Sequence, residues 1–181
     1  NPLARTDARG QVIGYIHDAA GRQLLQSHQD PGQELAAVYD VPAAVCPAGE
    51  QFAAGRVSTL FDGGGQTHYC YNRFGDVVRK VQQHAGSSLV LRYRYHPGGA
   101  LAAVIHADGT EVDYVHDSQG RVRDIGVRIA GGSRQMLLAG TRHAPFGPVT
   151  GWQFGNGRTV QRLLDQDYRV QSVADDRGQM V

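Results

Sequence analysis

Tyr114-Val115-His116-Asp117-Ser118-Gln119-Gly120 is the stretch that decides the fold, because its spacing recurs along the chain. A tyrosine is followed two residues later by a second ring, and four residues after that ring by a glycine. The residue directly after the second ring is Asp, Asn or His. The four copies of this unit are Tyr15, His17, Asp18 and Gly21; Tyr69, Tyr71, Asn72 and Gly75; Tyr93, Tyr95, His96 and Gly99; and Tyr114, His116, Asp117 and Gly120.

The chemistry of the unit predicts a strand that ends in a tight turn. Rings at positions i and i+2 project from the same face of a strand, and aromatic residues favour strands. An Asp or Asn side chain can accept a hydrogen bond from the backbone two residues on, and a glycine three residues later adopts the positive φ of a tight turn. Apolar alternation resumes after the glycine, in residues 77–81, 101–105 and 122–129. Each unit is therefore predicted to be one antiparallel hairpin.

Weaker copies extend the repeat to eight units. They keep the Asp-x-x-Gly core at Asp7/Gly10, Asp62/Gly65 and Asp175/Gly178, and at Asp165, where Tyr168 takes the place of the glycine. A two-step period of about twenty residues is typical of repeat architectures built from supersecondary units. We predict an all-β fold: a coiled strip of consecutive antiparallel β-hairpins forming one array over residues 1–181. Because the chain starts and stops within repeat units, we expect it to be a piece of a longer polypeptide.

These units resemble the YD repeats of Rhs proteins. The likeness is best at residues 116–122 and 17–22. A second family-like phrase, Phe154-Gly155-Asn156-Gly157-Arg158, leads through Asp165 to Tyr168. The resemblance covers residues 1–30 and 57–181. In between, residues 30–56 are rich in alanine, contain three prolines, and are expected to be an irregular or divergent insert.

The resemblance implies a function as well as a fold. Rhs proteins, and the similar cocoon subunits of Tc toxins and shells of teneurins, wind such strips into hollow shells. The chain is then expected to be a structural wall segment of a shell that encapsulates a toxin or effector domain for delivery to other cells. Its partners would be the rest of its own shell, the enclosed cargo domain and secretion machinery, and its parent protein would be secreted or at the cell surface. The family's autoprotease motif and toxin domain are not recognisable in these residues.

A second interpretation is a surface adhesion or carbohydrate-binding module. It is motivated by the many tyrosines and by Trp152, since sugars stack on exposed aromatic faces. The exposure of the rings distinguishes the two interpretations: rings packed between hairpins favour the wall, and a solvent-facing row favours sugar binding.

Composition excludes several other classes of function. The 24 glycines in 181 residues are about 13%, which suits a chain rich in turns, because the usual level is roughly 7%. The formal net charge is +1 and the charges of both signs are interspersed, so there is no basic stripe for nucleic acid. No apolar run approaches the length of a membrane span, and no signal peptide is evident in this segment.

Candidate catalytic and metal-binding residues all have a simpler structural explanation. His96, His106 and His116 recur at intervals of ten, as metal ligands on successive hairpins could, but His116 fills a ring position and His96 fills the Asp position of the repeat. Paired carboxylates such as Asp165 and Asp167 include a turn residue, and no nucleophile motif is present. We therefore expect no enzyme activity, no cofactor and no metal. Cys46 lies in the divergent insert and Cys70 between the paired tyrosines, and their spacing leaves a disulfide open.

Overall fold

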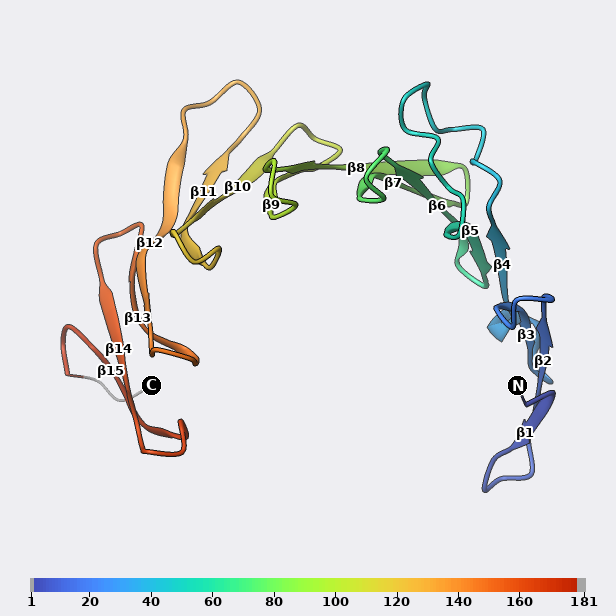
Figure 1. The fold of residues 1–181 in the computed structure, drawn as a ribbon, viewed down its shortest axis with the longest axis horizontal. Coiled ribbons are helices and arrows are strands. Elements are labelled where there is room, and N and C mark those ends of the chain that lie inside the picture. Colours follow the sequence, from blue (N-terminus) through green and yellow to red (C-terminus); the bar gives the residue numbers. More distant parts are fainter. Residues whose placement is uncertain (1, 179–181) are drawn as a thin grey trace. The chain divides into compact units, whose positions relative to one another are not determined.

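The computed structural model describes residues 2–178, which form an all-β chain of consecutive antiparallel strands with one short 3-10 helix, η1 (Pro31–Gln33). The predicted fold class is confirmed. In the hydrogen-bonded order of the sheet, β1 to β15 follow one another without a crossover, so each strand lies beside its neighbours in the chain (Figure 1). No helix within residues 2–178 is long and apolar enough to cross a membrane. The strands are β1 (Ala4–Thr6), β2 (Val12–His17), β3 (Gln23–Ser27), β4 (Leu35–Tyr39), β5 (Val57–Asp62), β6 (Gly65–Tyr71), β7 (Val77–His84), β8 (Ser87–Tyr95), β9 (Leu101–Ile105), β10 (Glu111–His116), β11 (Val122–Arg128), β12 (Gln135–His143), β13 (Val149–Phe154), β14 (Thr159–Leu164) and β15 (Val170–Asp175).

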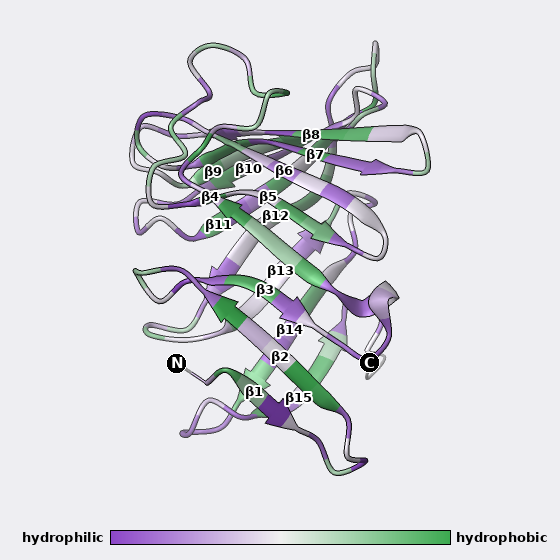
Figure 2. Ribbon diagram, turned by 90° about the vertical axis from the view of Figure 1, so that its right-hand side faces the viewer, coloured by the Kyte–Doolittle hydropathy of each residue, from purple (hydrophilic) through white to green (hydrophobic). Residues whose placement is uncertain are grey.

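The chain divides into two compact units, Asn1–Arg92 and Tyr93–Val181, with the boundary inside β8. Apolar and polar residues are interspersed along the strands of both units (Figure 2). The buried apolar residues of the described part are few and mostly small, and most of them lie in the first unit. They are Cys46, Ala53, Cys70, Tyr71, Val81, Ala103 and Val160. The stability of the fold therefore depends chiefly on hydrogen bonds between paired strands and within the turns.

The turns of the strong units close in one common way. In the unit at Asp117, the backbone N–H of Asp117 donates to the carbonyl of Arg121 (2.8 Å), and the N–H of Gly120 donates to the carbonyl of Asp117 (3.0 Å). Gly120 has a φ of 78°, as the sequence predicts. The same two bonds close the other strong units, at Asp18, Asn72 and His96, and the weaker copies at Asp7 and Asp165. Tyr168, in the glycine place of the last of these, also has a positive φ of 61°.

Three further turns with the same backbone closure begin at His106, Ala144 and Phe154. The turns at His106 and Ala144 were missed because no Tyr-x-ring pair precedes them and they lack the Asp that defines the weaker copies, whereas the turn at Phe154 lies in the family-like phrase of residues 154–158. In two of the three turns the acceptor side chain stands two residues after the first position: Asp108 accepts from the N–H of Thr110 (2.8 Å) and Asn156 from that of Arg158 (3.1 Å). The closure is thus a backbone property that several side-chain patterns support.

The copy at Asp62/Gly65 forms the predicted hairpin turn, because the N–H of Gly64 donates to Oδ1 of Asp62 (2.8 Å) and Gly65 has a positive φ of 134°. Asp62 and Gly65 pair directly across β5 and β6, so Gly63 and Gly64 alone form a two-residue hairpin turn. Gly65 is needed for another reason: a Cβ there would lie 2.1 Å from the carbonyl oxygen of Gln83 on β7. The three consecutive glycines therefore combine a tight turn with a close backbone contact.

A β-bulge follows several of the turns. His17 pairs with Gln23 while Ile16 pairs with Leu25, which leaves Leu24 as an extra residue on β3. Equivalent shifts occur after the turns at residues 72, 117 and 165. Each bulge displaces the alternation of side chains by one residue immediately after the turn and increases the local twist.

Part of the divergent segment 30–56 belongs to the sheet. Leu35–Tyr39 form β4, which pairs with β3 and β5, so the expectation of an irregular insert does not hold for these residues. The run Leu-Ala-Ala-Val-Tyr hides the strand because alanine gives little alternation. The departure from the hairpin pattern is confined to η1 before the strand and to the long connection between β4 and β5.

Candidate functional site

The repeat residues form a clamp at the turn rather than a catalytic constellation. At Asp117, Oδ1 accepts from the backbone N–H groups of Gln119 (2.9 Å) and Arg121 (3.0 Å), and Oδ2 accepts from Nε of Arg121 (2.9 Å). Asp18 makes the same three contacts with Ala20 and Arg22. Donation from the backbone N–H of the arginine is the main reason why the pKa of each carboxyl lies below its usual value. In the motif Asp-x-x-Gly-Arg, the Asp carboxylate therefore accepts hydrogen bonds from two backbone N–H groups of the turn and from the arginine side chain.

The other units with this turn, strong or weak, keep only part of the clamp. Asn72 accepts from the N–H groups of Phe74 and Asp76, and Asp165 from those of Asp167 and Arg169. His96 has no carboxylate to accept these backbone hydrogen bonds. Its ring lies edge-on to that of His116, with the ring centroids 5.4 Å apart. The histidines at ten-residue intervals are therefore only partly brought together, because His106 lies exposed at its own turn. Among the residues that the structure describes, no group of three His, Cys, Asp or Glu is placed to hold a metal ion.

The aromatic side chains of the repeat, and Trp152, differ in how far they are buried. Tyr71 is buried and donates its hydroxyl to the carbonyl of Val57 (2.7 Å), with the Arg56 guanidinium 5.7 Å from its ring centroid. The rings of Tyr15 and His17 are tilted with centroids 6.4 Å apart. The remaining tyrosines of the repeat are half-buried: Tyr15, Tyr69, Tyr93, Tyr95 and Tyr114. Trp152 is half-buried too, with Phe154 edge-on and the Arg162 guanidinium 4.8 Å from its ring.

The phrase at residues 154–168 forms two turns. Gly155 lies so close to β12 that a Cβ would be 1.7 Å from the carbonyl oxygen of Met136, and Asn156 and Gly157 complete the turn that begins at Phe154. Tyr168 packs its ring where a side chain on Gly147 would be, with its Cδ1 at 2.8 Å from the ideal Cβ position. This contact between neighbouring turns compensates for the strained φ of Tyr168.

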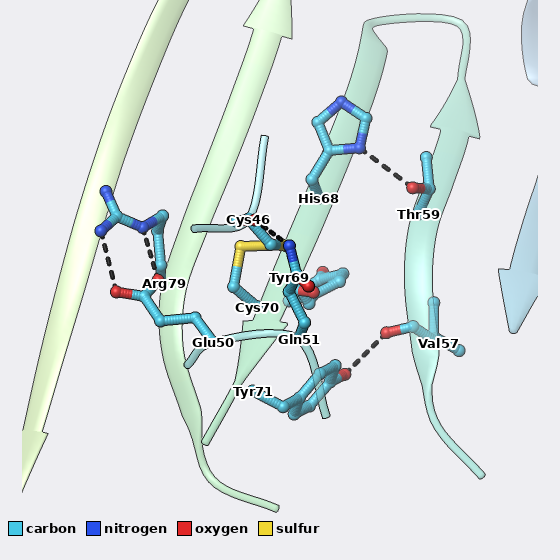
Figure 3. The surroundings of a disulfide bond; sticks show 10 residues. All are labelled: Cys46, Glu50, Gln51, Val57, Thr59, His68, Tyr69, Cys70, Tyr71 and Arg79. Atoms are coloured by element: carbon cyan, nitrogen blue, oxygen red, sulfur yellow. Dashed lines mark hydrogen bonds and ion pairs between the residues drawn. A yellow bond between two sulfur atoms is a disulfide. The ribbon is translucent and has the colours of Figure 1, made fainter. Parts of the chain in front are cut away.

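The most elaborate site is the connection between β4 and β5. We call residues 41–55 the clip segment. A disulfide joins Cys46 of this segment to Cys70 on β6, and both residues are buried (Figure 3). Glu50 accepts from Nε and Nη2 of Arg79 on β7, at 2.7 and 2.9 Å. The sequence left this disulfide open, because nothing in the spacing of two cysteines shows that a loop folds back over the strand.

Backbone contacts complete the attachment of the clip segment to β6. The N–H of Tyr71 donates to the carbonyl of Glu50 (3.0 Å) and the N–H of Phe52 to the carbonyl of Tyr71 (3.3 Å), on either side of a parallel bridge between Gln51 and Tyr71. The side chain of Gln51 donates to the carbonyl of Cys46 (2.8 Å) within the segment. Sequence reasoning missed Glu50 and Arg79, since 29 residues separate the pair.

The base of the clip segment is fixed by a separate cluster. Asp40 accepts from both terminal nitrogens of Arg22, at 3.0 and 2.6 Å, and from the N–H of Gly55 at 2.6 Å. Its hydrogen bonds from Arg22 are the main cause of its lowered pKa, about 2. Arg22, the arginine of the first Asp-x-x-Gly-Arg unit, also lies 4.5 Å from the ring centroid of Tyr39. One repeat arginine thus ties a turn, a strand end and the clip segment together.

Comparisons with known proteins agree with this picture at the level of the fold. No family model matches the chain, and no curated protein matches it. Among solved structures, the chain resembles TcdB2-TccC3-Cdc42 and TcdB2-TccC3, each with a TM-score of 0.79, 15% identity, and coverage of 100% of this chain and 10% of the other. It also resembles the Tc holotoxin pore of Photorhabdus luminescens, with a TM-score of 0.69, 13% identity, and coverage of 100% and 11%.

The chain spans about a tenth of the length of these Tc-toxin chains. At such low identity the likeness establishes the fold, and it extends over every hairpin. The resemblance to YD-repeat shell proteins, first seen in the spacing of Tyr, Asp and Gly, is therefore confirmed as a shared architecture of consecutive antiparallel hairpins.

Proposed function

We propose that this chain is a structural wall segment of a YD-repeat shell that encloses a toxin or effector domain and is delivered outside the cell that makes it. The observation that carries the proposal is the match of all its hairpins to segments of TcdB2-TccC3 chains. In this role no catalytic chemistry is required, and the residues of the repeat serve turn closure and strand pairing. The partners are the rest of the same shell and the enclosed domain.

The geometry supports such a role in two ways. A strand order without crossovers lets an array extend hairpin by hairpin, as a wall requires. The turn clamp at Asp18 and Asp117 satisfies backbone N–H groups through local contacts, so the turns do not need a large apolar core to be stable.

The test is a protease-protection assay on the parent protein that contains this chain and its cargo domain. We expect the cargo domain to resist proteinase K while the protein is folded, and to be digested when the wall is opened by Tyr71→Ala, which removes a buried ring. Phe146→Ala is the matched control, because Phe146 is 98% exposed and its loss leaves the sheet intact. An electron cryo-microscopy map of the same protein would show the cargo density inside the wall.

Digestion of the cargo at the same rate in the unaltered protein, Tyr71→Ala and Phe146→Ala would refute encapsulation. So would a map in which the hairpin array bounds no enclosed volume.

A further inference from the structure

We propose that the Cys46–Cys70 disulfide is a redox latch: when it is oxidised it holds the clip segment over β6, and when a dithiol reductant opens it the segment leaves the sheet. The proposal concerns this chain alone and holds whether or not the chain is part of a shell.

The clip segment has little besides the disulfide to hold it down. Of residues 41–55, all of which the structure describes, only Cys46 and Ala53 are buried, while Val41, Val45 and Phe52 are exposed. A segment that buries so few apolar side chains gains little from the hydrophobic effect. Its remaining attachments to the sheet are polar.

Those polar attachments are few and partly open to water. The Arg79–Glu50 ion pair has side chains that are 17% and 25% exposed, and two backbone hydrogen bonds connect the segment to Tyr71. Such bonds add little net stability, because the same groups bond to water when the segment separates from the sheet. The disulfide is therefore the principal restraint on the middle of the segment.

The base of the segment has independent restraints, which allows it to move as a flap. Asp40 keeps its bonds to Arg22 and to the N–H of Gly55 whatever the state of the cysteines. The N–H of Asp40 also donates to the carbonyl of Arg56 (3.1 Å). Release of Cys46 thus frees the middle of the segment while its two ends stay beside each other.

Movement of the flap would uncover the best-packed part of the first unit. Cys70 is fully buried, and His68, two residues earlier on the same face of β6, belongs to a buried row with Thr59 and Val81, which pair with it across β5 and β7. His68 faces Thr59 at 3.0 Å in this row (Figure 3). Reduction therefore acts where the array has most of its buried side chains.

The reaction is an ordinary thiol–disulfide exchange. A thiolate of the dithiol attacks Sγ of Cys46, which is on the outer segment and 3% exposed, whereas Cys70 is at 0%. A mixed disulfide forms at Cys46, and the Cys70 sulfur leaves as a thiolate that takes a proton from water. The second thiol of the dithiol then displaces Cys46, which gives two protein thiols and one oxidised dithiol. Closing the latch needs a thiol oxidant, as oxidising compartments provide.

The experiment is hydrogen exchange with mass spectrometry on the purified protein, before and after reduction with dithiothreitol. Peptides from residues 41–55 and from the Tyr71 end of β6 should exchange at least tenfold faster after reduction. The hairpin β10–β11, in the other unit and without cysteine, is the internal reference and should be unchanged. Cys46→Ala/Cys70→Ala should exchange rapidly in the clip segment with and without dithiothreitol.

Three outcomes would overturn the latch. The first is equal exchange of the clip segment in the oxidised and reduced protein. The second is faster exchange throughout both units on reduction, because the disulfide would then be a general staple. The third is alkylation of both cysteines in the folded, unreduced protein, because no disulfide would then be present. The unaltered protein gives each readout, so the result does not depend on the folding of the double variant.

Discussion

Replacing Gly120 by valine separates the conformational role of the turn from its packing. Gly120 has a φ of 78°, and a Cβ built on it would meet nothing within 4 Å. The Cβ itself therefore introduces no clash, and the main effect of the substitution comes from forcing a β-branched residue into the left-handed region.

The expected cost follows from this geometry. A non-glycine residue held in an unfavourable backbone region costs roughly 1–3 kcal/mol, and a β-branched residue is near the upper end. The loss of glycine also makes the unfolded chain less flexible, which offsets roughly 0.4–1 kcal/mol. The net destabilisation is about 2 kcal/mol, which lowers the Tm of a chain of this length by roughly 4–8 °C.

The chain offers a matched control in His106. It occupies the first position of a turn with the same backbone closure, and its N–H donates to the carbonyl of Thr110 (2.8 Å). His106→Ala keeps these backbone bonds at an exposed position, so it should change stability by less than about 0.5 kcal/mol. Gly120→Asn should fall between the two, because asparagine tolerates a positive φ.

The assay is thermal unfolding of the three variants by circular dichroism, with hydrogen exchange of β10 and β11 to locate the effect. Equal Tm shifts for Gly120→Val and His106→Ala would refute the turn assignment. So would a Gly120→Val effect spread evenly over all hairpins instead of concentrated at this one.

Two further predictions concern the first unit. The pKa of Asp40 is lowered from 3.8 to about 2 by Arg22, so the contribution of Asp40 to stability is present above pH 3.8 and is lost as the pH falls through 2. Asp40→Asn should therefore remove this part of the pH dependence of stability in acid unfolding titrations. A pH profile of stability that is the same in Asp40→Asn and the unaltered protein between pH 2 and 3.8 would contradict this assignment. Tyr71→Phe removes the hydroxyl that donates to the carbonyl of Val57 and should lower the free energy of unfolding by about 1 kcal/mol, measured by urea unfolding. Tyr69→Phe, on the same strand, should lower it clearly less. Equal losses of stability for the two variants would contradict the hydrogen bond assigned to Tyr71.

The fold could be predicted from the sequence because the repeat encodes local structure. A strand that ends in Asp-x-x-Gly needs only residues within five positions to form its turn, as the three contacts of Asp117 show. The strands after Gly75, Gly99 and Gly120 were likewise predicted from alternation and are confirmed.

What could not be predicted depends on contacts between residues far apart in the chain or on weak local signals. The Cys46–Cys70 disulfide and the Arg79–Glu50 pair need the clip segment to fold back over β6, and nothing local signals this. The strand at residues 35–39 was hidden by its alanines, and the turn at Ala144 has no acceptor side chain at its first position. The role of the tyrosines and Trp152 in carbohydrate binding stays a prediction.

The uninterrupted order of the strands has a consequence for how the protein acquires its structure. Since every strand pairs with the one made just before it, most native contacts have low contact order, and the entropy lost in closing loops is small at each step. Folding can then keep pace with synthesis, with each hairpin adding to the edge left by its predecessor as the polypeptide leaves the ribosome. The connection from β4 to β5 interrupts this vectorial growth once, because Cys46 must wait for β6 before it finds its partner.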